Sequence, residues 1–227
     1  MISNIQIISD LRLAMEMRQE LELMVTFKGV PVICKARVTQ IDGETVSLST
    51  RDPGIVRIEH EKKVSVLGSE YFEPSIAKVI RVDIRSGTLQ LSDFSYLGTR
   101  LGERMMMRVE PKEPIRVSLE SESLSFDGEI VDLSLNGIGI RIEQANYNPS
   151  LKPGTTIRTT FDLPNGHTVV EGTVLSSVKA GNTYRLSLRF NQDGPQKISI
   201  FRYLIDRRAE IESELKSDFE KARGAAN

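Results

Sequence analysis

Short segments in which apolar and polar residues alternate make up most of this chain, and they limit its fold more than any other feature. A period of two places successive side chains on opposite faces of an extended segment, which is typical of a half-buried β-strand. The pattern is clear in Leu21–Phe27 and again in Ile138–Ile142. The sequence therefore predicts a mainly β protein.

In the first half, turn residues that end in glycine separate the alternating segments from one another. A short helix over Leu11–Arg18, with Ser9 or Asp10 as its cap, is expected before them. The expected strands cover residues 21–27, 32–38, 45–49, 56–59, 63–67, 77–85 and 88–92. Because these short strands follow one another without a long helix, we expect a small split β-barrel.

The alternation stops over residues 93–103, where serine, threonine and glycine are mixed with charged residues, as is typical of a linker or an exposed loop. We place a domain boundary near Leu97, so that the first domain covers residues 1–97 and the second covers 98–227, beginning with a linker at 98–108. Further strands are expected at 115–119, 124–131, 138–142, 157–161, 167–178 and 184–190. Asp127-Gly128 either turns the chain or bulges a strand. These strands predict a second barrel of about six strands.

A C-terminal α-helix is expected to follow the second barrel, over residues 196–222, with Pro195 suited to its first turn. Its apolar side chains form one stripe that we expect to pack on the barrel and a thinner stripe beyond it: Ile198, Phe201, Leu204 and Ile205, then Ile211, Leu215 and Phe219. The thinner stripe fits either a homodimer formed through this helix or a solvated helix end. Both interpretations stay open.

Charge and aromatic content both argue against nucleic acid as a partner. The chain has 30 Lys plus Arg and 31 Asp plus Glu, so no overall positive field attracts a polyanion or an anionic membrane. Aromatic residues make up 6% of the chain, whereas barrels that bind single strands present aromatic platforms. Four aromatic residues are expected to face the interior of the second barrel: Phe126, Phe161, Tyr184 and Phe190. Any anion site must therefore be local.

The residue types that support catalysis are sparse and scattered. His60 and His167 are far apart in sequence, and neither a metal-ligand cluster nor a hydroxyl nucleophile with an evident base is present, so we expect no enzyme, metal or cofactor. The lone Cys34 is expected to be a buried thiol. Because no charged leader precedes an apolar run and no apolar stretch reaches about 18 residues, a cytoplasmic protein without membrane insertion is expected.

Two arginines, Arg104 and Arg108, enclose three methionines at the end of the expected linker. A guanidinium is a planar fork of donors, which suits phosphate oxygens or a base edge with paired acceptors, as in guanine. Arg100 and Arg104 have the same spacing, but Arg108 runs directly into the apolar Val109. We therefore favour Arg104 and Arg108 as a pair that binds an anion.

A second polar motif, Asp132-Leu-Ser134-Leu-Asn136-Gly137, follows about two dozen residues later. In an extended segment Asp132 and Ser134 share one face, and Gly137 lets the backbone approach a ligand closely. Asn136 tolerates a positive φ better than most residues, which suits a turn. A local turn, closed by side-chain to backbone hydrogen bonds of Asp132 and Ser134, is the alternative interpretation.

The two motifs, in this order and at this spacing, resemble the PilZ family, whose pattern is R-x-x-x-R followed by D/N-x-S-x-x-G. The resemblance implies a bacterial receptor for the second messenger cyclic di-GMP. Arg104 and Arg108 would hold phosphates and guanine faces, with Arg100 as a further phosphate contact, while Asp132, Ser134 and Gly137 would complete the pocket. Asn136 stands where relatives often have a second glycine, and its side chain could touch the ligand.

The order of a β-rich first domain, an arginine loop, a PilZ-type barrel and a terminal helix resembles the two-domain, flagellar-brake type of PilZ protein. The likeness is weaker over the first domain, which contains no sharp motif. It implies that binding of one nucleotide or an intercalated pair changes the interdomain arrangement and signals to a protein partner. That partner would be a flagellar motor or polysaccharide synthesis component, which links the protein to motility and biofilm formation. A PilZ-like interaction module that works without nucleotide is the alternative.

Overall fold

The computed structural model describes residues 4–67, 73–97, 107–121, 124–191 and 194–224. Within it the chain forms two compact units. The first comprises Met1–Phe27, Pro31–Met105 and Ile211–Asn227, and the second comprises Lys28–Val30 and Met106–Glu210. The expected division near Leu97 stays a prediction. The C-terminal helix contributes residues to both units.

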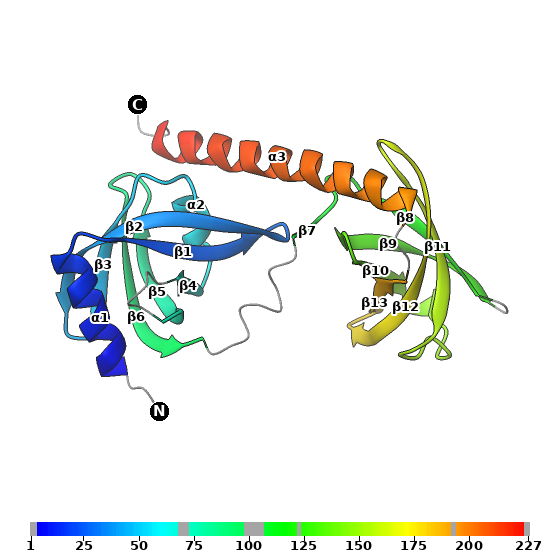
Figure 1. Ribbon diagram of the computed structural model, residues 1–227, viewed down its shortest axis with the longest axis horizontal. Helices are drawn as coiled ribbons and strands as arrows, with labels where there is room; N and C mark the ends of the chain where they lie inside the picture. The colour runs from blue at the N-terminus through cyan, green and yellow to red at the C-terminus, as the bar shows by residue number, and fades with distance from the viewer. Residues whose placement is uncertain (1–3, 68–72, 98–106, 122–123, 192–193, 225–227) are drawn as a thin grey trace. The chain divides into compact units, whose positions relative to one another are not determined.

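The first unit is a closed antiparallel barrel with the strand order β1-β2-β3-β6-β5-β4, in which β4 pairs back onto β1 (Figure 1). Its elements are α1 (Asn4–Glu16), β1 (Glu20–Phe27), β2 (Val30–Asp42), β3 (Thr45–Ser49), α2 (Ile55–Ile58), β4 (Lys63–Leu67), β5 (Ser75–Asp83) and β6 (Thr88–Tyr96). Alternate strand positions point into the barrel, as the sequence predicts, and Leu23 and Cys34 are fully buried there.

Several segments of the first unit differ from their predictions, among them β2, which covers Val30–Asp42 instead of residues 32–38. α1 begins at Asn4 rather than at Leu11, because Ile7 and Ala14 are buried together with Leu11 at helical spacing. β6 extends past Ser92 into the expected linker. The strand expected at 56–59 is the short helix α2, whose three apolar side chains, Ile55, Val56 and Ile58, are all buried. Three apolar residues in four positions fit either a strand or a helical turn, and the helical turn buries all three against the barrel.

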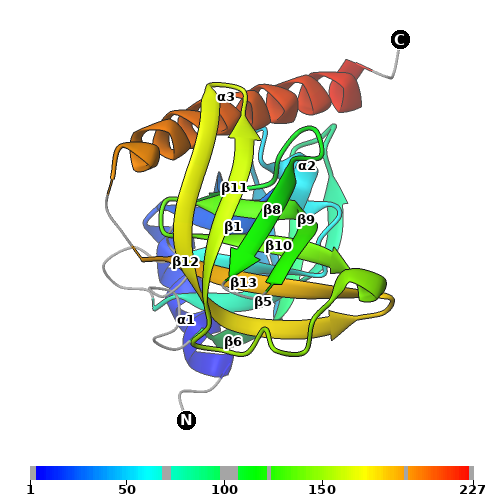
Figure 2. The same ribbon diagram turned by 90° about the vertical axis from the view of Figure 1, so that its right-hand side faces the viewer.

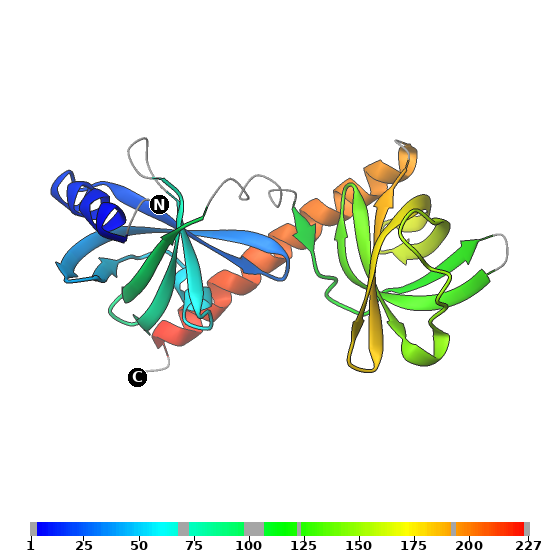
Figure 3. The ribbon, with the colours of Figure 1, turned by 90° about the horizontal axis from the view of Figure 1, so that it is seen from below.

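The second unit is also a closed antiparallel barrel, with the strand order β10-β13-β12-β11-β8-β9 and a pairing of β9 with β10 that closes it. In Figure 2 this barrel faces the viewer, and Figure 3 shows it from below. The short strand β7 pairs with β9. The elements of the second unit are β7 (Arg108–Val109), β8 (Arg116–Ser121), β9 (Leu124–Ser134), β10 (Gly137–Glu143), η2 (Gln144–Asn146), β11 (Thr156–Leu163), β12 (Gly166–Ala180) and β13 (Thr183–Phe190). The prediction of a mainly β protein with two small barrels and a C-terminal helix is confirmed.

A bulge in β9 sets the register of the second barrel at its functional edge. Asp132 is opposite Gly139, whereas Ile130 is opposite Ile140, so Val131 is the extra residue. At Asp127-Gly128 the structure has neither the turn nor the bulge that the sequence left open. Gly128 instead lies within regular pairing between β8 and β9.

The buried face of the helix α3 (Pro195–Gly224) matches the predicted stripe at Leu204 alone of its four residues. In the second unit its buried residues are Ile200, Tyr203, Leu204 and Arg207. The expected stripe is largely solvent-facing, with Ile198 56%, Phe201 51% and Ile205 44% exposed. Arg207 explains part of the difference, because its Nε donates to the carbonyl oxygen of Glu110 at 3.0 Å and a charged residue thereby becomes part of the buried face.

The end of α3 belongs to the first unit. Ile211 is buried, and Leu215 and Phe219 pack against the core of the first barrel. The guanidinium of Arg57 lies 3.7 Å from the centroid of the Phe27 ring and forms an ion pair with Asp218 of the helix. The thinner apolar stripe thus packs against the first barrel of its own chain, and a homodimer through this helix stays a prediction. No helix of the described residues is long and apolar enough to cross a membrane.

Candidate functional site

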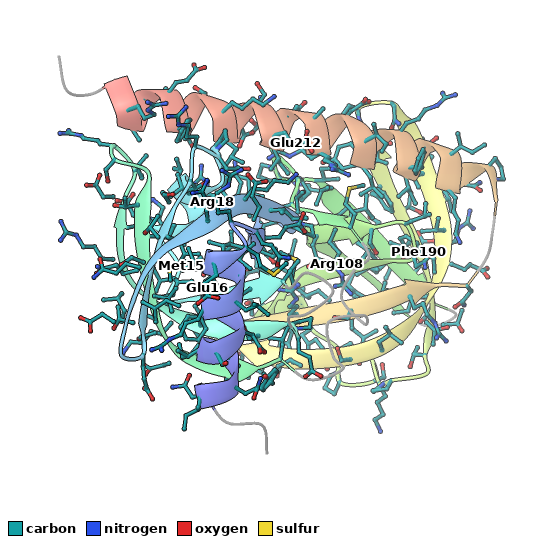
Figure 4. All side chains as sticks on the ribbon, turned by 60° about the vertical axis from the view of Figure 1, so that its left-hand side comes forward. Met15, Glu16, Arg18, Arg108, Phe190 and Glu212 are labelled. Atoms are coloured by element: carbon teal, nitrogen blue, oxygen red, sulfur yellow. The ribbon has the colours of Figure 1, made fainter. Side chains whose placement is uncertain are left out.

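The described residues of the two sequence motifs meet on the outer face of the second barrel. Arg108 of β7 is opposite Ser134 of β9, and Ser134 is in turn opposite Gly137 of β10. Asp132 lies two residues before Ser134 and therefore on the same face. Figure 4 labels Arg108 at this position. Arg100 and Arg104 lie outside the described residues.

The buried neighbours of these residues fix which way they point. Val109, Leu133 and Ile138 alternate with the motif residues along β7, β9 and β10, and all three lie in the barrel core. Because successive strand residues face opposite sides of a sheet, Arg108 and Asp132 must face outward. The binary pattern of the strands thus presents the motif on one surface.

Asp132 is a nearly buried carboxylate that holds two guanidiniums. Its side chain is only 9% exposed, and its Oδ1 lies 3.3 Å from Nη1 of Arg108. Its Oδ2 accepts from Nη2 of Arg185, which lies on β13. A buried carboxylate needs such partners, because an unpaired charge out of water is costly. With two guanidiniums around one carboxylate, the group has a net positive charge.

Gly139 makes this arrangement possible, because a Cβ at its position would lie 2.7 Å from Oδ2 of Asp132. Any larger residue there would displace the carboxylate. The register places Gly139 between Asp132 on one side and Ser187 on the other, so the carboxylate lies over β10.

Ser134 and Gly137 close the turn that joins β9 to β10. The hydroxyl of Ser134 donates to the carbonyl oxygen of Gly137 at 3.0 Å, which is the local turn contact that the alternative interpretation predicts. A Cβ on Gly137 would lie 2.3 Å from the carbonyl oxygen of Leu188. The close approach of β13 therefore requires glycine at this position, and this packing requirement is independent of any contact with a ligand.

Asn136 lies in this turn without a positive φ, and its proposed contact with a ligand stays a prediction. A positive φ occurs at three non-glycine residues of the described chain, Arg18, Lys28 and Asp93, so the turn forms without a left-handed Asn136. The carbonyl oxygen of Asn136 accepts from the backbone N–H of Phe190 at 2.9 Å. This bond ties the turn to β13.

Two guanidiniums of this site face solvent. The side chains of Arg108 and Arg185 are 59% and 51% exposed, so both guanidiniums present donors to solvent while a buried carboxylate restrains them. Planar donor forks of this kind match phosphates and base edges with paired acceptors. In the described residues no group of three or more His, Cys, Asp or Glu could hold a metal ion.

Comparison with known families matches residues 99–206 to the PilZ domain. Residues 99–206 are a PilZ domain. The match contains every described residue of the two motifs and ends within α3, so the resemblance drawn from the sequence motifs is confirmed for this part of the chain. The PilZ domain includes the whole second barrel and the carboxylate that joins Arg108 to Arg185.

Several solved structures are similar to this chain over most of its length, but their sequence identity to it is low. The Klebsiella pneumoniae MrkH complex with c-di-GMP is 16% identical, with 93% of this chain and 97% of that chain covered and a TM-score of 0.49. Escherichia coli YcgR in complex with c-di-GMP is 13% identical, with 95% of each chain covered and a TM-score of 0.46. The Bacillus subtilis inhibitor of motility MotI is 13% identical, with 84% of this chain and 96% of that chain covered and a TM-score of 0.44. No match was found among curated proteins.

Arg185 belongs to the candidate site by its contact with Asp132, and no sequence motif predicted it. It occupies an ordinary polar position of an alternating strand, between Tyr184 and Leu186. Its pairing with Asp132 depends on the register across β9, β10 and β13, which no local motif encodes. The single available signal was that an arginine, rather than a short polar residue, stands there.

Other residues weighed in the sequence lie apart from this site. His60 is exposed, and Nδ1 of His167 lies 2.6 Å from Oδ1 of Asp162 at the exposed turn between β11 and β12. Of the aromatic residues expected inside the second barrel, Phe161 and Phe190 are buried. Phe126 and Tyr184 are half-buried, and the ring of Tyr184 stacks on that of Tyr147 with centroids 3.6 Å apart.

Proposed function

We propose that this protein is a bacterial receptor for cyclic di-GMP and that the outer face of its PilZ domain is the binding surface. One observation carries the proposal: Arg108, which faces outward, is held by the buried Asp132 beside Ser134 and Gly137. The ligand is an anionic dinucleotide with guanine bases. Guanidinium forks match both its phosphate oxygens and the acceptor edge of guanine.

Restraint of Arg108 by Asp132 favours binding for an entropic reason. A free arginine side chain loses rotamer freedom when it grips a ligand, and this loss weakens the complex. The carboxylate of Asp132 fixes the guanidinium beforehand, so less freedom is lost on binding. Arg104 and Arg100 are proposed to complete the grip from the segment before β7, and Asn136 is proposed to contact the ligand from the turn.

Calorimetric titration of cyclic di-GMP into the wild type and Arg108→Ala tests this proposal. A hydrogen bond to a charged group contributes roughly 1.5 to 3 kcal/mol, so we expect the variant to bind at least about tenfold more weakly. Arg141→Ala is the matched control, because Arg141 is a half-exposed arginine on the same barrel that pairs with Glu129 at 2.9 Å. Equal affinities of the wild type and Arg108→Ala would overturn the proposal.

We further propose that ligand binding changes the arrangement of the two domains. The segment that contains Arg100 and Arg104 joins the first barrel to β7 in sequence, so a ligand that fixes this segment restricts the connection. A ligand shifts such an equilibrium only by its different affinity for the two arrangements, and arginine contacts made in one arrangement supply that difference. Small-angle scattering should change on saturation of the wild type but not on equal addition to Arg108→Ala. An unchanged curve for the saturated wild type would exclude this step.

The proposed output is a signal to a protein partner, either a flagellar motor or a polysaccharide synthesis component in the cytoplasm. Affinity capture from cell extract with and without cyclic di-GMP should retain such a partner in a ligand-dependent way. Retention that is the same in both conditions would instead favour an interaction module that works without nucleotide. The hydrogen bond of Ser134 to the carbonyl oxygen of Gly137 fits that alternative. An interaction module of this kind would give no saturable heat in the calorimetric titration with cyclic di-GMP.

A further inference from the structure

β13 carries a second, outward-facing guanidinium beside the predicted site. Leu186 and Leu188 are buried in the barrel core, so Arg185 points to the opposite, outer side of the strand. Its side chain is 51% exposed. Gly139 of β10 lies between this strand and Asp132 of β9, and its missing side chain leaves room for the contact across the sheet.

The charges around Asp132 are unbalanced. One carboxylate, itself nine-tenths buried, pairs with Arg108 through one oxygen and with Arg185 through the other. The two guanidiniums therefore lie on either side of a single negative charge, and one positive charge remains for an anion. Each guanidinium has five N–H donors. Both side chains are more than half exposed, so donors beyond those that contact Asp132 face solvent.

A neighbouring pair shows that this imbalance is specific to Asp132. Arg141 is directly opposite Arg185 in the sheet and is 49% exposed, but it pairs with Glu129, which is 36% exposed. There one arginine meets one partly solvated carboxylate, so the charges balance. Two arginines in adjacent positions thus differ in the carboxylate that each one contacts, which makes Arg141 a matched control for Arg185.

We propose that Arg185 is a further ligand-contacting residue, which binds paired acceptors of cyclic di-GMP from the side of Asp132 opposite Arg108. This inference rests on the proposed function. Asp132 then acts as a bridge that spaces two guanidinium forks across β10, and the ligand spans from β7 to β13. The site is wider than the two sequence motifs indicate.

Calorimetric titration of cyclic di-GMP into the full chain tests the inference. Arg185→Ala should weaken binding about tenfold or more, while Arg141→Ala should stay within about twofold of the wild type. Arg185→Lys keeps the charge but lacks the planar fork, so it should restore little of the loss. If Arg108→Ala weakens binding and Arg185→Ala does not, the inference fails and the proposed function stands. If the wild type gives no saturable heat, the proposed function fails.

A double-mutant cycle separates direct contact from support of Asp132. In an Asp132→Asn background, Arg185→Ala should still weaken binding, because the contact with the ligand is lost whether or not the carboxylate is present. If Arg185 served only to hold Asp132, the second substitution would add nothing, and that result would overturn the inference. Thermal unfolding of each variant checks that the barrel is intact, and Arg185→Gln is used in place of Arg185→Ala if the alanine variant fails to fold.

Discussion

Both barrels contain an arginine paired with an aspartate, but the two arrangements serve different ends. In the first unit Arg57 is only 17% exposed, lies over the Phe27 ring and pairs with Asp218 of α3. In the second unit the carboxylate of Asp132 is the buried partner, and the guanidinium of Arg108 is 59% exposed. The mostly buried guanidinium of Arg57 holds the helix, whereas the exposed guanidinium of Arg108 presents donors to solvent, where we propose that a ligand binds. Exposure of the guanidinium, rather than residue type, separates the structural pair from the proposed binding pair.

The largest effect should come from the region where α3 meets the first barrel. Ile211→Ala removes a side chain that is only 1% exposed, so the free energy of unfolding should fall by about 2 to 5 kcal/mol. Affinity for cyclic di-GMP should be unchanged. Denaturant unfolding and calorimetry measure the two quantities. Ile205→Ala on the same helix is the control, because Ile205 is 44% exposed and its removal should cost far less. Equal costs for the two variants would show that the end of the helix is not anchored.

In the second unit Gly137→Ala should destabilise by roughly 1 to 3 kcal/mol. Its new Cβ would lie 2.3 Å from the carbonyl oxygen of Leu188, and a backbone atom gives way less readily than the end of a side chain. Chemical denaturation of the variant measures the loss. Gly172→Ala is the control, because a Cβ on Gly172 would meet no atom closer than 3.2 Å. Gly181→Ala is not a suitable control, because Gly181 has a φ of 61°, which strains any other residue. Stability as high as that of Gly172→Ala would contradict the close approach of β13.

Arg57→Ala sharpens the comparison directly. Loss of the contact with Phe27 and of the ion pair with Asp218, which is itself 40% exposed and solvent-screened, should cost about 1 to 2 kcal/mol. Binding of cyclic di-GMP should stay at the wild-type level. Arg108→Ala should show the reverse pattern, with weaker binding and little loss of stability. If both variants lost affinity equally, the division into a structural and a binding arginine would be wrong.

The smallest effect concerns the lone thiol. Burial raises the pKa of Cys34 to about 12, so the folded thiol stays protonated well above neutral pH. Because the unfolded chain has the lower pKa, roughly 8.5, the stability contributed by this group is present below that value and is lost as the pH rises toward about 12. A thiol reagent at pH 8 should react slowly with the native protein and rapidly in denaturant, and Cys34→Ser should not react. Rapid reaction of the native protein would contradict the burial.

The strands with clean alternation and a turn at each end could be predicted from sequence to the residue. β3 and β4 have the predicted bounds. α2 could not, because three apolar residues in four positions fit either structure until the barrel supplies the surface that covers them. The buried face of α3 was also missed, since its apolar residues Ile198 and Phe201 are exposed while Arg207 is buried.

The candidate site divides in the same way. Arg108, Asp132, Ser134 and Gly137 could be found because they form motifs along the chain, and the register brings them onto one face. Arg185 could not, since its contact with Asp132 depends on the bulge at Val131 and on the absence of a side chain at Gly139. Pairings across three strands are set by the whole sheet and not by a local pattern.

The most direct test of the account follows the arginine side chains themselves. Nuclear magnetic resonance of the guanidinium Nε–H groups during titration with cyclic di-GMP reports each arginine separately, with lysine variants used for assignment. The signals of Arg108 and Arg185 should shift together and saturate, while those of Arg57 and Arg141 stay in place. Saturable binding that leaves Arg108 and Arg185 unshifted would contradict the proposal that the guanidiniums around Asp132 hold the ligand.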